Sequence, residues 1–182
     1  MIRIILVLLF FFSNIYAWEK CLYSSIKDDE LLTAFNDCAK IDKNQKLQIK
    51  QYHKSNIKFY DNLTCIYVSK KTYYYHKNGT SFQAVPFDNG CDYFDENKLA
   101  RVIINNKISY VNKDLKIILP TNFFYATRFY NKKAIVCNNG IKKIKDGEHF
   151  FYRGGVCNLM NLKGELLLKE NTTFEEVSKL LK

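Results

Sequence analysis

The sequence lacks the short motifs that mark the common catalytic and cofactor sites. It has no Gly-x-Ser-x-Gly, no His-Glu-x-x-His, no phosphate-cradling glycine loop and no dinucleotide-binding fingerprint. It also lacks Cys-x-x-Cys and His-x-x-x-His spacings, which argues against a zinc site. We therefore expect no catalytic residues, no cofactor and no metal in this chain.

Arginine is scarce, and the basic residues form no cluster. Besides Arg3 the chain contains only Arg101, Arg128 and Arg153, so few side chains could bind phosphate in a bidentate way. No block of five or more lysines or arginines occurs. Lysines scattered in this way are typical of side chains that solvate turns and blunt strand edges.

The total charge is nevertheless strongly basic. Without its first 17 residues the chain has 27 basic and 18 acidic residues, a net charge of +9. Such a charge favours anionic partners, for example an envelope polymer, an acidic glycan or nucleic acid. The alternative is that the lysines only solvate the surface.

Residues 1–17 have the pattern of a cleaved signal peptide. Arg3 precedes an unbroken apolar run over residues 4–12, and Ala17 offers a small residue at a plausible cleavage point. The run is too short to span a bilayer comfortably, and no second run of spanning length follows. We expect cleavage after Ala17, no membrane span in the mature chain, and a secreted or periplasmic location. An uncleaved membrane anchor is the alternative.

An even number of cysteines in an exported chain argues for disulfides, here three. The six residues are Cys21, Cys38, Cys65, Cys91, Cys137 and Cys157. Fifteen pairings are possible, and the sequence alone does not choose among them. Nearest-neighbour pairing is the simplest hypothesis.

The stretch 99–120 predicts a three-stranded antiparallel meander. Runs rich in β-branched residues at 102–104, 108–111 and 117–119 are separated by polar turn residues. We therefore expect a mainly β fold with a buried apolar set in and after this stretch. Its members are Val102, Ile104, Tyr110, Ile117, Ala126, Phe129, Ala134 and Val136.

Related segments recur along the chain. Turn tetrapeptides begin at Asp42, His76, Asn112 and Asn161, at intervals of 34, 36 and 49 residues. Intervals of this size are typical of repeat arrays. The longer last interval predicts an inserted hairpin.

The segment Lys107–Val136 resembles the WG-repeat (KWG) pattern without a gap. The matching residues are Lys107, Tyr110, Val111, Asn112, Lys113, Lys116, Ile117, Ile118, Leu119, Pro120, Phe123, Ala126, Phe129, Ala134 and Val136. Ile108-Ser109 stands where the family has Trp-Gly, and Leu115 replaces a turn glycine. The resemblance implies an array of short β-meanders over about residues 39–169, and it implies architecture more than activity.

A short helix is expected at each end of this array, within a single domain over residues 18–182. Residues 24–39 combine a serine cap, an acidic first turn and apolar residues at steps of three and four. Near the C-terminus, Thr173 and Glu176 match a capping box that opens a helix over 173–182. Both helices would cover open ends of the array.

Two aromatic stretches are candidate ligand surfaces. A run of three tyrosines is expected to turn its middle ring inward and to expose Tyr73 and Tyr75, which sugar rings or bases could stack on. The segment 138–156 departs most from the repeat, and it offers Tyr152 and Arg153 as a second candidate surface.

Only three histidines are available for acid–base catalysis of a ribonuclease-like kind. His76 occupies a repeated turn position, whereas His53 and His149 lie in unrelated contexts. We therefore expect an exported, non-catalytic binding or interaction protein of the envelope or extracellular space, whose partner is an anionic polymer or glycan, or another protein. A small secreted hydrolase and a structural envelope component are the alternatives.

Three Asn-x-Thr sequons begin at Asn62, Asn78 and Asn171. They become glycan acceptors only in a eukaryotic secretory pathway.

Overall fold

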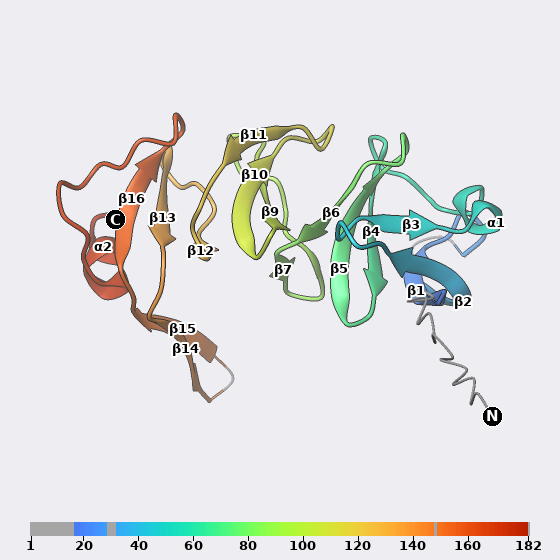
Figure 1. Cartoon of the computed structure of the whole chain (residues 1–182), viewed down its shortest axis with the longest axis horizontal. Coiled ribbons are helices and arrows are strands. Elements are labelled where there is room, and N and C mark those ends of the chain that lie inside the picture. Colours follow the sequence, from blue (N-terminus) through green and yellow to red (C-terminus); the bar gives the residue numbers. More distant parts are fainter. Residues whose placement is uncertain (1–16, 29–31, 148, 182) are drawn as a thin grey trace, which may run out of the picture.

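A computed structural model describes residues 17–28, 32–147 and 149–181. The predicted signal peptide lies outside the described residues, except for Ala17. The elements follow one another along the long axis of the molecule in approximate chain order (Figure 1). No helix among the described residues is long and apolar enough to cross a membrane.

The chain is mainly β, as predicted. Nine strands pair in the order β11-β10-β9-β6-β5-β4-β1-β2-β3, and every pair is antiparallel. Their bounds are β1 Glu19–Ser24, β2 Leu32–Ile41, β3 Leu47–Ile49, β4 Leu63–Val68, β5 Lys71–His76, β6 Ser81–Ala84, β9 Ala100–Ile104, β10 Lys107–Val111 and β11 Ile117–Pro120. Valine, isoleucine and aromatic residues recur in these strands, because such side chains pack well on a pleated surface.

The remaining strands form smaller sheets. These are β7 (Pro86–Phe87) with β8 (Gly90–Cys91), β12 (Tyr125–Ala126) with β13 (Lys133–Cys137) and β16 (Cys157–Asn161), and β14 (Ile141–Asp146) with β15 (His149–Gly154). Two short helices complete the described elements, α1 (Gln51–Lys54) and α2 (Phe174–Lys179).

The predicted meander over residues 99–120 is confirmed by β9, β10 and β11. Asn105 and Asn106 join the first two strands with positive φ angles of 50° and 60°, as a type I′ turn requires. Six of the eight residues predicted to be buried are buried, and Ile104 is half-buried. Ile117 is 39% exposed, because it lies on the edge strand β11 next to a shift in register.

Five turns share one hydrogen-bond pattern. In each, the N–H of the fourth residue donates to the carbonyl of the first, and the N–H of the first donates to the carbonyl of the fifth. The first side chain also accepts a backbone N–H, and the fourth residue has a positive φ between 56° and 92°. The turns begin at Asp42, His76, Asp95, Asn112 and Asn161. The sequence indicated four of them, including the turn role of His76, but not the turn at Asp95.

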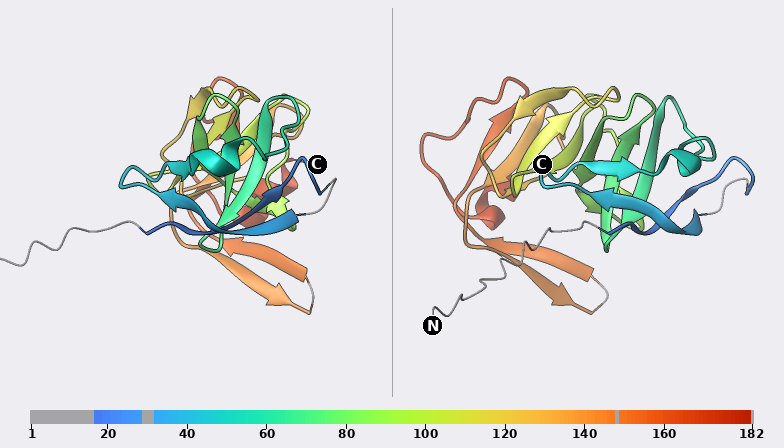
Figure 2. Two further views of the ribbon diagram at one scale, coloured as in Figure 1. Left: turned by 90° about the vertical axis from the view of Figure 1, so that its right-hand side faces the viewer. Right: turned by 45° about the vertical axis from the view of Figure 1, so that its right-hand side comes forward.

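A hairpin is present where the long last interval predicted one. Strands β14 and β15 pair with each other between β13 and β16, which also pair with each other. The hairpin projects away from the rest of the chain (Figures 1 and 2). At its base Gly155 has a φ of +84°, and an added Cβ would lie 3.1 Å from Sγ of Cys157, so the site requires glycine.

Three disulfides join nearest-neighbour cysteines, as the simplest pairing predicted. They are Cys21–Cys38, Cys65–Cys91 and Cys137–Cys157. Within the described ranges no cysteine is free. Three disulfides indicate an oxidising extracellular or periplasmic setting.

The predicted helix over residues 24–39 is wrong, because β1 and β2 occupy most of this segment. Residues 29–31 lie outside the described residues. In β2, Phe35 pairs with Cys21 and Ala39 pairs with Glu19, so three residues of β2 lie opposite one of β1. A step of four keeps one face of a regular strand, so Phe35 and Ala39 reach the same cluster, and the bulge lets Cys38, three positions after Phe35, reach it as well. The spacing therefore imitates a helical period.

The predicted C-terminal helix is present as α2. Thr173 is its N-cap, and the side chains of Thr173 and Glu176 each accept a backbone N–H of the other residue, which confirms the capping box. Val177 is fully buried, whereas Leu180 of the predicted apolar face is 53% exposed. The helix packs on β13, β15 and β16.

Candidate functional site: an aromatic groove

The tyrosine run on β5 does not form an exposed platform. Tyr73, Tyr74 and Tyr75 are exposed by only 0%, 4% and 4%. Alternation does separate the rings: Tyr73 and Tyr75 pack in one cluster, and Tyr74 packs in another. Because β5 lies inside the sheet with apolar clusters on both faces, the prediction that Tyr73 and Tyr75 are exposed is wrong.

The described structure does not assemble a histidine site. His53 is buried, its Nδ1 lies 3.2 Å from the hydroxyl oxygen of Tyr23, and the rings of Phe35 and Tyr52 contact it edge-on. The side chain of His149 lies outside the described residues. Over the described ranges, no group of three or more histidine, cysteine, aspartate or glutamate residues could hold a metal.

A groove of about 820 Å³ lies beside the central strands. Its walls come mainly from residues 85–96, residues 124–130 and the β14–β15 hairpin, which contributes Lys143 and Tyr152. The remaining lining residues are Arg101, Ile103, Ile108 and Leu181. Ligand sites in proteins typically occupy about 300–1,000 Å³ and have mostly apolar walls with a few polar groups. This groove fits that description, because aromatic rings provide much of its lining.

Two aromatic pairs with the same spacing line the groove. Phe87 and Tyr93 are six residues apart, and so are Phe124 and Tyr130. All four rings are solvent-exposed, by 41%, 51%, 54% and 58% in that order. Phe87 and Tyr93 also meet edge-to-face with centroids 4.9 Å apart. The recurrence of Phe-x5-Tyr is the sequence pattern that could have identified this site.

Arg128 lies over the first aromatic pair. Its guanidinium carbon is 3.6 Å from the ring centroid of Tyr93 and 4.3 Å from that of Phe87, which is a cation–π arrangement. Its Nη1 is 3.9 Å from the Asp92 carboxylate and makes no hydrogen bond within the described residues. Nη1 is buried, so this atom meets Asp92 as an ion pair without a hydrogen bond.

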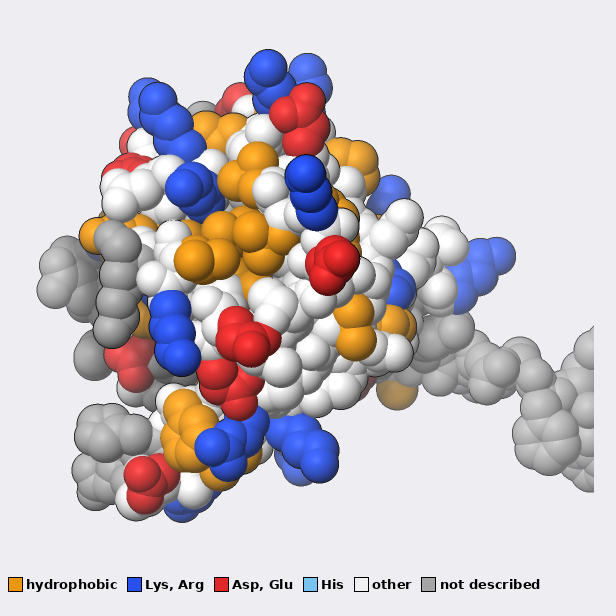
Figure 3. Space-filling model, turned by 90° about the vertical axis from the view of Figure 1, so that its left-hand side faces the viewer, with side chains coloured by type: hydrophobic (Ala, Val, Ile, Leu, Met, Phe, Trp, Pro, Cys, Tyr) orange, Lys and Arg blue, Asp and Glu red, His pale blue; other side chains and the backbone are white. Residues whose placement is uncertain are grey.

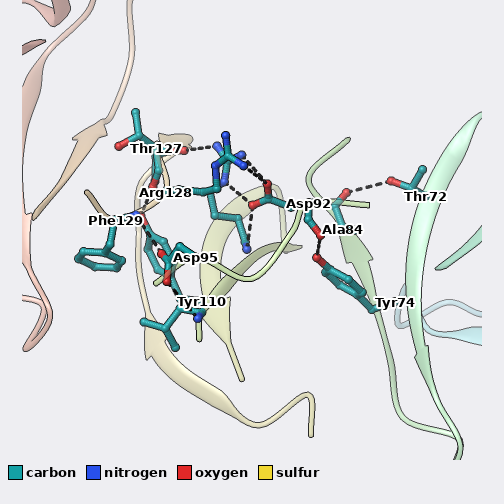
Figure 4. Close-up of polar contacts among 12 residues, drawn as sticks. Thr72, Tyr74, Ala84, Asp92, Asp95, Tyr110, Thr127, Arg128 and Phe129 are labelled. Atoms are coloured by element: carbon teal, nitrogen blue, oxygen red, sulfur yellow. Dashed lines mark hydrogen bonds and ion pairs between the residues drawn. The ribbon is translucent and has the colours of Figure 1, made fainter. Parts of the chain in front are cut away.

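The Asp92 carboxylate pairs with both Arg101 and Arg128, and its polar contacts are drawn in Figure 4. The Asp92 carboxylate, which is fully buried, accepts hydrogen bonds from Arg101 Nε at 2.7 Å and Nη2 at 3.0 Å. Arg101 Nη1 also donates to the carbonyl of Ala126 at 2.9 Å. Burial alone would lower the pKa of Arg101, but the hydrogen bond and the charge of Asp92 raise it above its ordinary value. The ion pair thereby joins the two segments that carry the aromatic pairs.

Further hydrogen bonds join the second segment to the first and to β10. The Asp95 carboxylate accepts the N–H of Phe129, and the Glu96 carboxylate accepts the N–H of Asn131, both at 3.1 Å. The Tyr110 hydroxyl donates to the carbonyl of Thr127 at 2.6 Å. The groove is thus held in shape by polar contacts on both of its loops.

The charged side chains that line the groove are balanced, and Lys107 adds a cation 3.1 Å from the ring centroid of Phe124. Three cations line the groove, Arg101, Arg128 and Lys143, together with the carboxylates Asp95 and Glu96. The Asp92 carboxylate lies directly behind Arg101 and adds a third negative charge. Recognition in this groove would therefore rest on rings and hydrogen bonds more than on net charge.

Only one residue of the second predicted surface lines the groove. The ring of Tyr152 lies in the groove wall, 4.6 Å from the ring of Tyr125 and 5.7 Å from that of Phe174. Arg153 is exposed, and its Nε donates to Glu175 of α2 at 3.2 Å. The structure therefore places these two neighbours in different surroundings.

These features define an all-β, disulfide-bonded protein with a preformed aromatic groove. No protein-family model, no curated protein and no solved structure matches the chain.

Proposed function

We propose that this chain is an exported, non-catalytic binding protein whose groove takes a carbohydrate chain. The observation that carries the proposal is the two exposed Phe-x5-Tyr pairs that line one groove, the first of them in contact with Arg128. Sugar rings present apolar C–H faces that stack on aromatic rings, and the polar groups of the wall offer partners for hydroxyls. The hydrogen bonds between the two groove segments keep the rings in place before binding, which lowers the entropy cost of association.

Three further observations support the wider proposal. The disulfides and the pattern of residues 1–17 support export through an oxidising compartment. The five turns with one hydrogen-bond pattern support an array of repeated meanders. With the resemblance of residues 107–136 to WG repeats, they favour a protein that presents a surface rather than one that performs a reaction.

Stacking predicts a specific loss when one ring of each pair is removed. The variants Tyr93→Ala and Phe124→Ala should each weaken binding of short neutral oligosaccharides about five- to tenfold, which corresponds to about 1 kcal/mol. Isothermal titration calorimetry on the oxidised mature protein measures this loss. The matched control is Tyr52→Ala, since Tyr52 is 75% exposed and does not line the groove. Equal affinity of the groove variants and the wild type would refute the carbohydrate proposal.

An anionic polymer is the second candidate ligand, because the mature chain carries a net charge of +9. A high-salt wash distinguishes the anionic polymer from the neutral glycan. Because the Debye length falls to about 3 Å near molar salt, a polymer held by scattered lysines should elute in that wash. A neutral glycan stacked in the charge-balanced groove should remain bound. Release of shortened sugars in the same assay would support the hydrolase alternative, and no affinity for any glycan would favour a protein partner or a structural envelope role.

A further inference from the structure

Among the described residues, the contacts of the β14–β15 hairpin with the rest of the chain lie near its base. Ile141 packs against the C-terminal core cluster, and the ring of Tyr152 packs against Tyr125 and Phe174. The N–H of Gly154 donates to the Glu175 carboxylate at 2.9 Å. Beyond these anchors the hairpin extends into solvent (Figure 2).

The hairpin exposes aromatic rings next to lysines. Phe150 and Phe151 are 53% and 43% exposed, and Lys142, Lys143 and Lys145 on the paired strand are exposed as well. The ammonium of Lys143 lies 4.0 Å from the ring centroid of Phe150. Apolar and basic side chains lie side by side on this projection in the lower part of Figure 3.

The strand register places the two phenylalanines on opposite faces of the hairpin. Phe150 is paired with Lys145, and Phe151 is paired with Ile144. Directly paired residues share a face, and successive residues alternate between faces. A flat protein surface could therefore cover only one of the two rings. A medium that surrounds the hairpin could cover both.

We propose that this hairpin docks the protein on an anionic lipid bilayer, with Phe150 and Phe151 entering the interface and the lysines contacting lipid phosphates. The headgroup region surrounds an inserted element on all sides, which matches a hairpin with rings on both faces. Residues 141–153 contain four basic and two acidic residues, so the charge complements an anionic surface. Neither phenylalanine lines the groove, so their variants test this proposal independently of the groove, whereas Lys143 belongs to both surfaces.

Vesicle co-sedimentation of the oxidised mature protein tests this proposal. The protein should pellet with vesicles of phosphatidylcholine containing phosphatidylglycerol, and not with phosphatidylcholine alone. Phe150→Ser/Phe151→Ser should reduce the affinity at least about tenfold, because two partly buried rings are lost. Lys142→Glu/Lys145→Glu should reduce it at least about tenfold as well.

Matched controls distinguish insertion of the hairpin from a general effect of exposed apolar side chains. Ile117→Ser/Ile118→Ser removes two apolar side chains of the edge strand β11 that are 39% and 43% exposed, and it should leave vesicle binding unchanged. The phenylalanine variant should keep the wild-type thermal unfolding and oligosaccharide affinity.

A fluorescent reporter tests insertion directly. In Trp18→Phe/Phe151→Trp, the emission of the new tryptophan should shift to the blue on adding the anionic vesicles. No binding to anionic vesicles at low salt, or binding that the phenylalanine variant retains in full, would overturn the proposal.

Discussion

Two buried tyrosines differ in whether the hydroxyl has a hydrogen-bond partner. Tyr73 and Tyr110 are both fully buried. The Tyr110 hydroxyl donates to the carbonyl of Thr127, whereas the Tyr73 hydroxyl has no hydrogen-bond partner within the described residues. Burial raises the pKa of Tyr73 to about 12, with a smaller contribution from Glu19, and burial also raises the pKa of Tyr110.

Removing each hydroxyl should therefore have opposite consequences. Tyr73→Phe should leave the free energy of unfolding unchanged or raise it by up to about 1 kcal/mol, because an unsatisfied polar group leaves the core. Tyr110→Phe should lower it by about 1–2 kcal/mol, because the carbonyl of Thr127 loses its partner. Urea unfolding monitored by circular dichroism measures both values. A clear loss of stability in Tyr73→Phe would show that its hydroxyl has a partner after all.

Between elements, one carboxylate connects the hairpin base to α2. Glu175 accepts the N–H of Gly154 and the Nε of Arg153. Its own N–H and that of Gly154 hold the pKa of Glu175 below the ordinary value of 4.5, with Arg153 contributing in the same direction. Since the ionised form makes these contacts, the joint between hairpin and helix depends on pH.

The sign of the pH effect follows from the lowered pKa. The contribution of Glu175 is fully present above about pH 4.5 and is lost as the pH falls through its lower folded-state pKa. The amide proton shift of Gly154 in NMR should titrate with a midpoint below 4.5, and Glu175→Gln should abolish this titration. The control Glu165→Gln, in the turn that begins at Asn161, should leave it intact. A midpoint at or above the ordinary glutamate value would contradict the assignment.

Across the whole molecule, each disulfide stabilises a different region. Cys21–Cys38 joins β1 to β2, Cys65–Cys91 joins β4 to β8, and Cys137–Cys157 joins β13 to β16. The paired residues are separated by 17, 26 and 20 positions. Loops of this length typically contribute about 2–4 kcal/mol each by restricting the unfolded chain.

Native material should therefore contain no reactive thiol. The unreduced mature chain should resist alkylation and weigh six hydrogens less than the reduced chain in intact mass spectrometry, since three disulfides are present. Reduction should lower the melting temperature markedly. Six alkylatable thiols in the native protein would contradict the disulfides and reopen metal binding.

Features that depend on neighbours in the chain could be predicted from the sequence. The meander over 99–120, the inserted hairpin, the capping box at Thr173 and the nearest-neighbour disulfides all rest on contacts between nearby residues. Turn chemistry and β-branched runs act over a few positions, so they are readable without the fold. The aromatic residues of the groove also have a local pattern, the repeated Phe-x5-Tyr spacing. The sequence does not show that these rings are exposed, and exposure is what distinguishes them from core residues.

The tertiary structure alone decided the remaining features. Whether residues 32–41 form a helix or a strand depended on pairing with β1, because a bulge gave them a helical spacing. Whether Tyr73 and Tyr75 face solvent depended on the clusters that cover both faces of β5. The groove exists because the buried pair of Asp92 and Arg101 joins two loops that the chain separates. Local sequence determines strands and turns, whereas burial and site formation require contacts between distant segments.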